Sequence, residues 1–192
     1  MKAIIPEQFA RGRLRYERIE EQHAADLQRL MAEPLVLRTL WPWAAPPSEA
    51  DLRASLEARI EHWERQGFGL WALQDRSTGE FVGRGGLQFT DAGGVSAVEV
   101  AWAVMPRRWG EGLATELAHA SIEVAFDGLE LHELVALTLP DNFGSRRVME
   151  KTGFAYRHEV VHAGLPHVLY ARGRGHPPKP LLRSAPQNAG PL

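Results

Sequence analysis

The pattern of hydrophobic and polar positions divides the chain into strand-like and helix-like segments. Strict alternation over residues 14–18 predicts a short first strand. Apolar side chains at helical spacing predict four helices, over residues 24–33, 48–66, 110–125 and 143–152. Alternating or continuous apolar runs predict further strands over 70–74, 80–90, 97–104, 131–139, 154–161 and 167–172.

The order of these elements predicts the fold class. A meander of strands is followed by a single strand–helix–strand crossover and a terminal hairpin. One crossover is too few for a doubly wound sheet, so we expect an α+β fold with a mixed, mostly antiparallel sheet and helices on both faces. Gly83, Gly85 and Gly86 interrupt one strand and predict a bulge or a close backbone approach there.

Length and composition limit the classes of protein. The chain has 192 residues, which predicts a single domain over residues 1–172, followed by a proline-rich tail over 173–192 that we expect to be disordered. The formal net charge of -2 disfavours non-specific nucleic-acid binding. The absence of cysteine excludes disulfides and cysteine nucleophiles. No run of 18 apolar residues occurs, so we expect a cytoplasmic protein without membrane partners.

The segment from Met105 to Thr115 carries the clearest candidate chemistry. It follows a strand and opens a helix, with glycines at 110 and 112 that let a ligand approach the backbone. The unpaired N–H groups of a first helical turn suit a pyrophosphate, and Arg107 and Arg108 add charge at the mouth.

Two nucleotide-binding motifs and a non-functional turn are the other interpretations of this segment. A P-loop requires Lys and then Ser or Thr after the second glycine, whereas Leu113 and Ala114 stand there. A dinucleotide fingerprint would need a small residue where Thr115 stands and an acidic residue such as Glu130 or Glu133 further on, so this alternative stays open. A glycine-rich turn with solvated arginines is the non-functional alternative.

Two segments resemble one enzyme family. Arg107-x-x-Gly110-x-Gly112 resembles the acyl-CoA loop of the GNAT N-acetyltransferase superfamily. The segment from Asn142 to Phe154 is similar to the N-x-x-S-x-R-V-x-E-K-x-G-F segment of the branch that acetylates ribosomal-protein N-termini. The resemblance covers about residues 13–172 in element order.

This resemblance implies a splayed sheet in which acetyl-CoA lies between two parting parallel strands, here 97–104 and 131–139. It implies no metal, so His158, His162, His167 and His132 are expected to be structural. The expected acetyl-CoA contacts are Val104, Arg107, Arg108, Trp109, Gly110, Gly112, Leu113, Ala114, Asn142 and Ser145.

The strand over 97–104 has two unlike faces. Its bulky residues alternate with three alanines around Glu99, which leaves room for a substrate. Because carboxylates are seldom buried, we expect Glu99 to act as general base and to contact the acceptor; an exposed edge or a structural ion pair is the alternative. The family also has a frequent bulge near the end of this strand, which would shift the phase of its faces.

The remaining catalytic roles come from the resemblance. A backbone N–H of Ala103 or Val104 would stabilise the oxyanion. Many relatives protonate the thiolate with a tyrosine where this chain has Met149, so Ser145 is the substitute candidate, with helix capping as its structural alternative. Asn142 is expected to bind the pantetheine amides.

The acceptor is the least defined part. Trp41 and Trp43 lie in a proline-rich loop that should border the acceptor cleft, where they would bind substrate or pack over the core. We expect a bacterial N-acetyltransferase, a monomer or homodimer, that acetylates a protein or peptide N-terminal amine by direct attack. The alternatives are a small-amine acetyltransferase acting on an antibiotic, polyamine or amino acid, and a non-catalytic acyl-CoA-binding module.

Overall fold

The strands form one eight-stranded sheet in the order β1-β2-β3-β4-β5-β6-β8-β7. The computed structural model describes residues 5–40 and 45–175. All neighbouring strands are antiparallel except β5 and β6, which are parallel. The strands are β1 (Gln8–Arg11), β2 (Leu14–Arg18), β3 (Leu70–Asp75), β4 (Phe81–Asp91), β5 (Ser96–Val104), β6 (Glu133–Thr138), β7 (Ala155–His162) and β8 (Leu165–Gly173).

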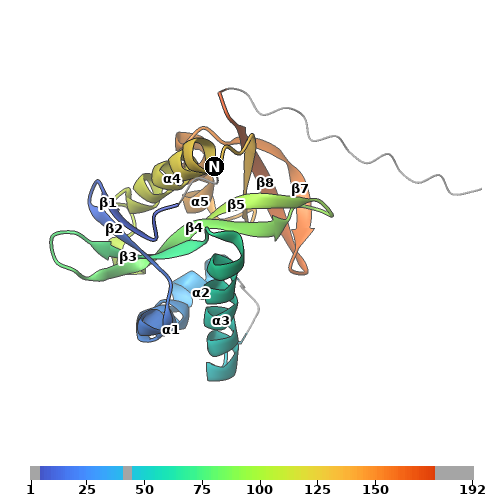
Figure 1. Cartoon of the computed structure of the whole chain (residues 1–192). Helices are drawn as coiled ribbons and strands as arrows, with labels where there is room; N and C mark the ends of the chain where they lie inside the picture. Colours follow the sequence, from blue (N-terminus) through green and yellow to red (C-terminus); the bar gives the residue numbers. More distant parts are fainter. Residues whose placement is uncertain (1–4, 41–44, 176–192) are drawn as a thin grey trace, which may run out of the picture.

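Helices cover both faces of this sheet, as Figure 1 shows. The helices are α1 (Ala24–Ala32), α2 (Pro34–Leu40), α3 (Glu49–Gln66), α4 (Leu113–Glu123) and α5 (Phe143–Lys151). One face packs against α4 and α5 through a core that includes Leu117 and Met149, and the other packs against α1 to α3 through a core that includes Leu30 and Leu56. The predicted α+β class with helices on both faces is confirmed.

Helix α3 shows why the ends of some elements could be predicted from the sequence. Ser48 and Asp51 exchange hydrogen bonds in a capping box, and the helix ends at Gly67, whose φ of 72° is accessible to glycine at little cost. Such capping side chains act locally, so the sequence already marks both ends.

Two elements were not predicted. Pro34 ends α1 as expected, but it also begins α2, because proline is well tolerated at the first position of a helix. Strand β1 is a four-residue edge strand without an alternating apolar pattern of its own. It was missed because its pairing with β2 is what places it in the sheet.

The glycines of β4 mark close packing, as predicted. A Cβ at Gly85 would lie 2.3 Å from Leu117 Cδ2 and 2.6 Å from the carbonyl oxygen of Ala101. Helix α4 therefore sits directly on β4. The expected bulge is seen in the pairing of β3 with β4, between Leu73 and Gln74. The register between β4 and β5 is continuous, so β5 keeps the same two faces to its end, contrary to the family-based expectation.

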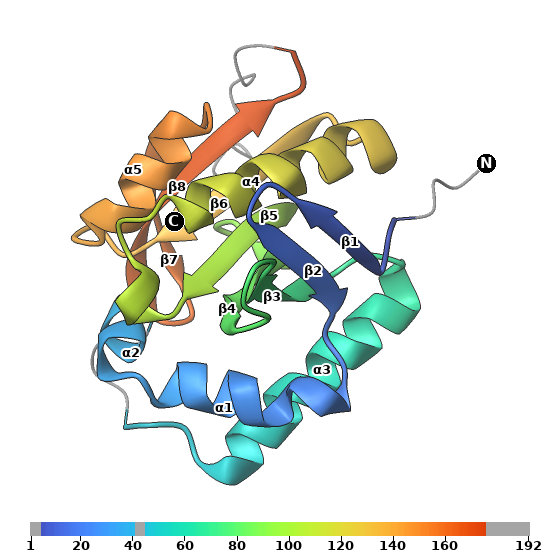
Figure 2. The same cartoon turned by 90° about the vertical axis from the view of Figure 1, so that its left-hand side faces the viewer.

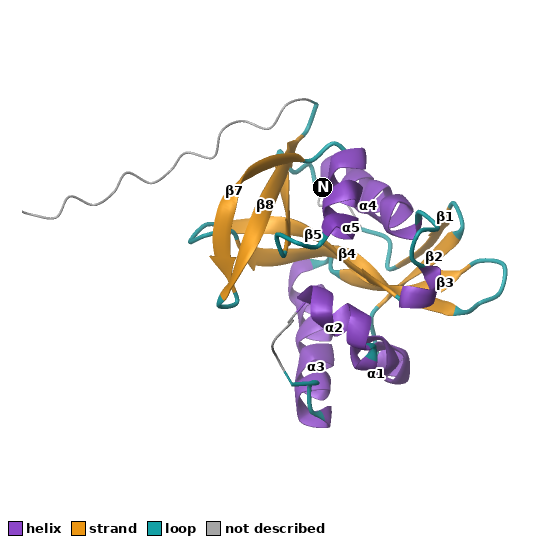
Figure 3. Ribbon diagram, turned by 180° about the vertical axis from the view of Figure 1, so that it is seen from behind, coloured by secondary structure: helices purple, strands orange, loops and turns teal. Residues whose placement is uncertain are grey.

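The parallel strands β5 and β6 part almost at once. Their only ladder pair is Glu99 with Val135, whereas β6 and β8 share six pairs. Figure 3 shows β7 and β8 turned steeply away from β4 and β5. The splayed sheet that the resemblance implied is present, with Glu99 at the point where the strands separate.

Some expectations fall on residues that the structure does not describe. Trp41 and Trp43 lie outside the described residues, as does most of the proline-rich tail, from residue 176 onward. Strand β8 continues to Gly173, one residue beyond the expected domain boundary. Among the helices of the described ranges, none is long and apolar enough to cross a membrane.

Candidate active site

The loop between β5 and α4 offers backbone N–H groups at the end of the parted strands. After Val104 the chain forms a short 3-10 turn, and Gly110 and Gly112 then adopt φ values of 83° and 81°. Gly112 caps α4 without a side chain, so the N–H groups of Leu113 and Ala114 belong to a first turn that lacks intrahelical acceptors. A Cβ at Gly110 would meet no atom within 4 Å, which leaves open space over the loop.

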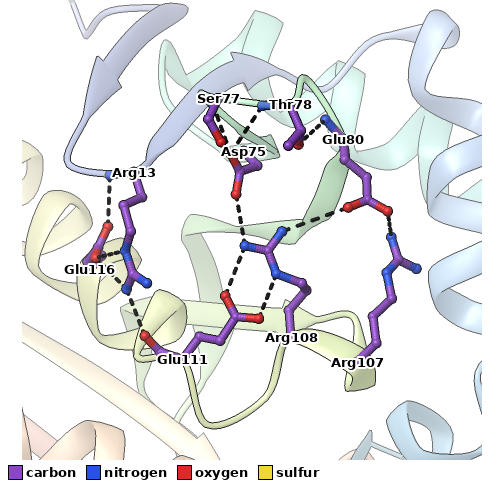
Figure 4. Close-up of polar contacts among 9 residues, drawn as sticks. All are labelled: Arg13, Asp75, Ser77, Thr78, Glu80, Arg107, Arg108, Glu111 and Glu116. Atoms are coloured by element: carbon purple, nitrogen blue, oxygen red, sulfur yellow. Dashed lines mark hydrogen bonds and ion pairs between the residues drawn. The ribbon is translucent and has the colours of Figure 1, made fainter.

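An ion-pair network holds this loop, as Figure 4 shows. The Arg108 guanidinium lies 2.8 Å from a carboxylate oxygen of Asp75, at the end of β3, and 2.8 Å from one of Glu111 in the loop. Hydrogen bonds from Ser77 and then Arg108 lower the pKa of Asp75, and Arg108 lowers that of Glu111. The same two carboxylates raise the pKa of Arg108. Its guanidinium is therefore an anchor for the loop.

A second pair of contacts ties the loop to the β1–β2 turn. Arg13 donates from Nε to Glu116 at 2.7 Å and from Nη2 to the carbonyl oxygen of Glu111 at 2.7 Å. Arg107 pairs with Glu80 and is about half exposed. The free positive charge expected from Arg107 and Arg108 is thus largely matched by carboxylates, and the positive character of the loop rests on its backbone N–H groups.

The register of β5 distinguishes the two candidate oxyanion donors. Met105 donates from its N–H to the carbonyl of Val82 at 2.8 Å, and Val104 stands opposite Gly83. Because antiparallel pairs alternate, the N–H of Ala103 faces β4, which corrects that candidate, while the N–H of Val104 faces the gap toward β6. The same alternation turns the N–H of Trp102 into the gap, a donor that sequence analysis missed because the register was unknown.

Trp109 closes the near end of this gap. Its indole Nε1 donates to the carbonyl oxygen of Val104 at 2.7 Å, while the residue remains 46% exposed. The indole therefore lies between the end of β5 and the start of α4, on the surface where the two strands part.

Glu99 is buried at the point of separation. Only 8% of the residue is exposed, and its Oε2 accepts a hydrogen bond from Gln88 Nε2 at 2.9 Å. Burial raises the pKa of Glu99, while the hydrogen bond from Gln88, the electrostatic effect of His162, the backbone N–H of Leu137 and the charge of Arg84 oppose that shift. The expected burial is confirmed, and the contact with Leu137 on β6 bridges the parted strands.

Gln88 was missed by the sequence analysis. It pairs with Glu99 across β4 and β5, a contact that requires the strand register. The available signal was alternation: Arg84, Gly86 and Gln88 share one face of β4, and two of these three carry polar side chains within or directly after the buried stretch 81–87.

The other two predicted site residues are Ser145, in the first turn of α5, and Asn142, which caps this helix. Asn142 caps the helix by accepting a hydrogen bond from the N–H of Ser145 at 3.1 Å, so its side chain has a structural partner. Met149 is buried in the core. Tyr170 is also buried, and its hydroxyl accepts from Arg146 Nε at 3.1 Å and donates to Glu150 at 3.3 Å.

The histidines of the last hairpin form contacts with protein groups. The rings of His162 and His167 meet edge to face, with centroids 5.2 Å apart. His162 Nδ1 contacts the carbonyl oxygen of Asp91, and His167 Nδ1 contacts that of Leu165, each at 3.1 Å. Over the ranges 5–40 and 45–175, no group of three or more His, Asp or Glu side chains is arranged to hold a metal ion.

Comparison with known proteins decides the family. Residues 13–155 match the family model described as the acetyltransferase (GNAT) domain. The chain belongs to the GNAT acetyltransferase family. This membership confirms the resemblance drawn from the loop and from the Asn142–Phe154 segment.

Two curated relatives of this GNAT chain come from Bacillus subtilis. The uncharacterized protein YkkB is 32% identical over 106 residues, which is 55% of this chain and 62% of the relative. The probable N-acetyltransferase YjcK is 30% identical over 98 residues, 51% of this chain and 52% of the relative. The matched region thus spans about half to three fifths of these relatives.

Solved structures share the GNAT fold. A putative GNAT-family acetyltransferase from Bordetella pertussis has a TM-score of 0.76 at 25% identity, covering 88% of this chain and 100% of that one. A ribosomal-protein-S5-alanine acetyltransferase from Vibrio fischeri has a TM-score of 0.68 at 17% identity, covering 88% and 97%. The aminoglycoside acetyltransferase AAC(6')-Ib, solved with coenzyme A, has 0.69 at 19%, covering 84% and 95%. At these last two identities the likeness concerns the fold alone.

Proposed function

We propose that this GNAT chain transfers an acetyl group from acetyl-CoA to a primary amine by direct attack of the amine on the thioester. The observation that carries the proposal is the single Glu99–Val135 pair between β5 and β6. Beyond it the strands part, with a buried carboxylate at the apex and the first turn of α4 at the open end. This arrangement provides a base at one end of a gap and an anion site at the other.

The residues around the gap fit acetyl-CoA. The pyrophosphate would lie on the N–H groups of Leu113 and Ala114, over the space left by Gly110 and Gly112. Arg108 would position this loop through its own ion pairs. On the gap side of β5, Val104 would bind the pantetheine arm, with Asn142 and Ser145 facing it from α5.

Glu99 would take the proton of the attacking amine. A buried carboxylate with a raised pKa is a better proton acceptor than a solvated one. An α-amino group has a pKa of about 8 and a lysine side chain about 10.4, so a carboxylate base suits an N-terminal amine better than a lysine. This difference supports a protein or peptide N-terminus as the acceptor.

Backbone N–H groups would stabilise the charge that develops on the thioester oxygen. Trp102 and Val104 both direct their N–H into the gap, where these groups would donate hydrogen bonds to the thioester oxygen. For the departing thiolate, Met149 offers no proton, so Ser145 or a water molecule would supply it.

Other functions remain distinct alternatives. The ribosomal-protein and aminoglycoside enzymes named above share this fold, so a small-molecule amine is the second candidate acceptor. The methionine at 149 favours a third candidate, a non-catalytic acyl-CoA-binding module. We infer a cytoplasmic monomer or homodimer in each case, with no nucleic-acid or membrane partner.

Thermal unfolding with acetyl-CoA, coenzyme A and NAD tests the ligand. At about 100 times the dissociation constant, a specific ligand adds about 2.7 kcal/mol to the free energy of unfolding. We expect the two CoA ligands to raise the melting temperature and NAD to leave it unchanged. A rise with NAD alone, or no rise with any of them, would contradict the proposal.

Thiol release then tests the chemistry. The acceptors are N-terminal peptides, the same peptides with a blocked N-terminus and one lysine, and small amines that include a polyamine and an aminoglycoside. We expect release with free N-termini above the other classes. Preference for a small amine would favour the second candidate, and binding without release would favour the non-catalytic module.

A further inference from the structure

Arg84 is a buried cation on the face of the sheet that α1 to α3 cover. The residue lies on β4 and is 7% exposed, yet among the described residues its guanidinium makes no hydrogen bond and no ion pair within 4 Å. Burying an unpaired charge is strongly unfavourable, and buried arginines normally meet a carboxylate or several acceptors. An arginine held this way indicates a site whose anion comes from outside the described chain.

Arg84 lines a cavity of about 110 Å³ between α1 and α3, two of the helices that cover this face of the sheet in Figure 2. Arg59 on α3 lines the same cavity, donates from Nη1 to the Ser55 carbonyl at 2.6 Å, and leaves its own Nε unpartnered. Leu27 and Leu56 form apolar walls. The cavity therefore combines the buried Arg84 and the half-buried Arg59 with apolar walls, while a third arginine, Arg53, lines it from an exposed position on α3.

The two arginines repel each other in the absence of an anion. Burial and the charge of Arg59 together lower the pKa of Arg84 to about 9, and the negative charge of Glu99 opposes this shift. Burial also lowers the pKa of Arg59. Arginine side chains are cationic at neutral pH, so a bound carboxylate would relieve their repulsion and supply acceptors for the unpartnered N–H groups.

The carboxylates near the cavity do not neutralise it. Glu21 and Glu49 also line it, but both are exposed and neither forms an ion pair with Arg59 or Arg84. Glu99, a buried carboxylate, attracts Arg84 electrostatically, but its hydrogen bonds are with Gln88 and the backbone N–H of Leu137. The deep end of the cavity is therefore cationic, with acidic groups only at its mouth.

The cavity and Glu99 lie on one face of the same strand pair. Arg84 stands opposite Ala103, and Gln88 stands opposite Glu99, so the two functional positions are four residues apart along the strands. At about 3.3 Å per residue this separation is about 13 Å between Cα atoms. An extended peptide crosses that distance in about four residues.

We propose that the acceptor carries a carboxylate as well as its amine, and that this carboxylate binds between Arg59 and Arg84 while the amine lies at Glu99. For a peptide acceptor the carboxylate belongs to an acidic side chain about four residues from the N-terminus. The assignment rests on the proposed acetyl transfer and adds the class of acceptor: amines with an anionic group within about 13 Å.

Paired peptides test this specificity. Each pair of C-terminally amidated hexapeptides differs only by Glu or Gln at one position from 2 to 5. We expect kcat/KM to be about tenfold or more higher for Glu at the best position, chiefly through KM. Arg84→Met and Arg59→Met should bring the ratio close to one, and Arg84→Lys should restore part of it. Arg65→Met, an exposed site on the same helix as Arg59, should keep the full ratio.

A flat wild-type scan would overturn the proposal, as would a ratio that survives both Arg84→Met and Arg59→Met. The scan needs only the wild-type protein, so it decides even where a variant fails to fold. Adding free glutarate separates the two sources of a carboxylate. Competition with the Glu peptide supports the acceptor's own carboxylate, whereas acceleration of the Gln peptide indicates a free anion effector and overturns the assignment.

A binding measurement keeps this test independent of turnover. Melting temperatures are compared in glutarate and in NaCl at equal ionic strength. We expect glutarate to raise the melting temperature of the wild type and of Arg65→Met but not of Arg84→Met. An equal rise in all three would locate the anion elsewhere and overturn the proposal. If acetyl-CoA fails to stabilise the protein while glutarate still does so through Arg84, the transferase function fails and the anion site stands.

Discussion

Two arginine-rich regions, the loop before α4 and the cavity between α1 and α3, use the same side chain in opposite ways. In the α4 loop, Arg108 meets Asp75 and Glu111 at hydrogen-bond distance. In the α1–α3 cavity, Arg84 is more deeply buried and meets no carboxylate among the described residues. The loop arginine stands in a recognisable motif and the cavity arginine does not. A sequence motif therefore locates a segment, whereas the ion-pair partners of a side chain decide whether it has a structural role or is available to bind an anion.

The largest effect is expected at Glu99, which lies between the two regions. Glu99→Gln removes the proposed base and should lower kcat by about 10²–10⁴-fold, the usual range for general acid–base catalysis. Acetyl-CoA affinity and the Glu/Gln peptide ratio should persist, which would separate the chemistry from both arginine sites. Single-turnover kinetics with peptide and labelled acetyl-CoA measure it; a decrease below threefold would exclude Glu99 as the base.

The same variant has a predicted stability signature. Because burial raises the pKa of Glu99, the folded state is disfavoured as pH rises above the ordinary carboxyl value of 4.5. Glu99→Gln should therefore melt at a higher temperature than the wild type at pH 7. The difference should vanish below about pH 4, where the wild-type carboxyl is protonated in both states. A lower melting temperature at pH 7 would show that the carboxylate is stabilising.

The next largest effect tests the loop itself. Gly112→Val places a β-branched residue at a φ of 81° beside the first turn of α4, which costs about 1–3 kcal/mol and obstructs the N–H groups. Acetyl-CoA affinity, measured by calorimetry, should fall by more than about tenfold. Gly67→Val is the matched control, since Gly67 has a φ of 72° at the end of α3, away from the loop. Equal losses in both variants would point to global destabilisation.

The two arginine regions should respond with opposite signs to one substitution. Arg108→Met leaves Asp75 and Glu111 without their partner, so the melting temperature and the acetyl-CoA affinity should both fall. Arg84→Met replaces an unpaired buried cation with an apolar group, so the ligand-free melting temperature should rise, by about 2–4 °C for each kcal/mol gained. Two changes of the same sign, measured by differential scanning calorimetry, would remove the contrast between the regions.

The smallest effects are expected in the pH dependence of stability and at the half-exposed Arg107. The lowered pKa values of Asp75 and Glu111 stabilise the folded state above about pH 4.5, and this contribution is lost as pH falls through the folded values. Denaturant titrations should therefore show a smaller loss of the free energy of unfolding between pH 6 and pH 3 for Arg108→Met than for the wild type.

Arg107→Gln, which breaks an exposed pair with Glu80, should change acetyl-CoA affinity by less than about threefold.

Local signals predicted most of the fold. The capping box at Ser48, the glycine at 67 and the apolar run of β6 act over a few residues, so element type and boundary were visible in the chain. Strand β1 was not visible, because its pairing with β2 carries it. Helix α2 was missed because Pro34 marks both the end of one helix and the start of the next.

The candidate site divides in the same way. Gly110, Gly112 and Glu99 were predicted, because backbone freedom and a lone carboxylate among alanines are properties of the sequence. Trp102 and Gln88 were missed, because both depend on the register between β4 and β5.

What the sequence determined by itself was the family, the loop and the carboxylate, since these are written in residue type and short-range spacing. The tertiary structure decided how each charge is used. Arg108 meets carboxylates from the end of β3 and from its own loop, while Arg59 on α3 and Arg84 on β4 line one cavity and form no ion pair among the described residues. Neither arrangement has a sequence pattern, because an ion pair depends on which elements pack together, and the energy of a charge depends on what surrounds it after packing.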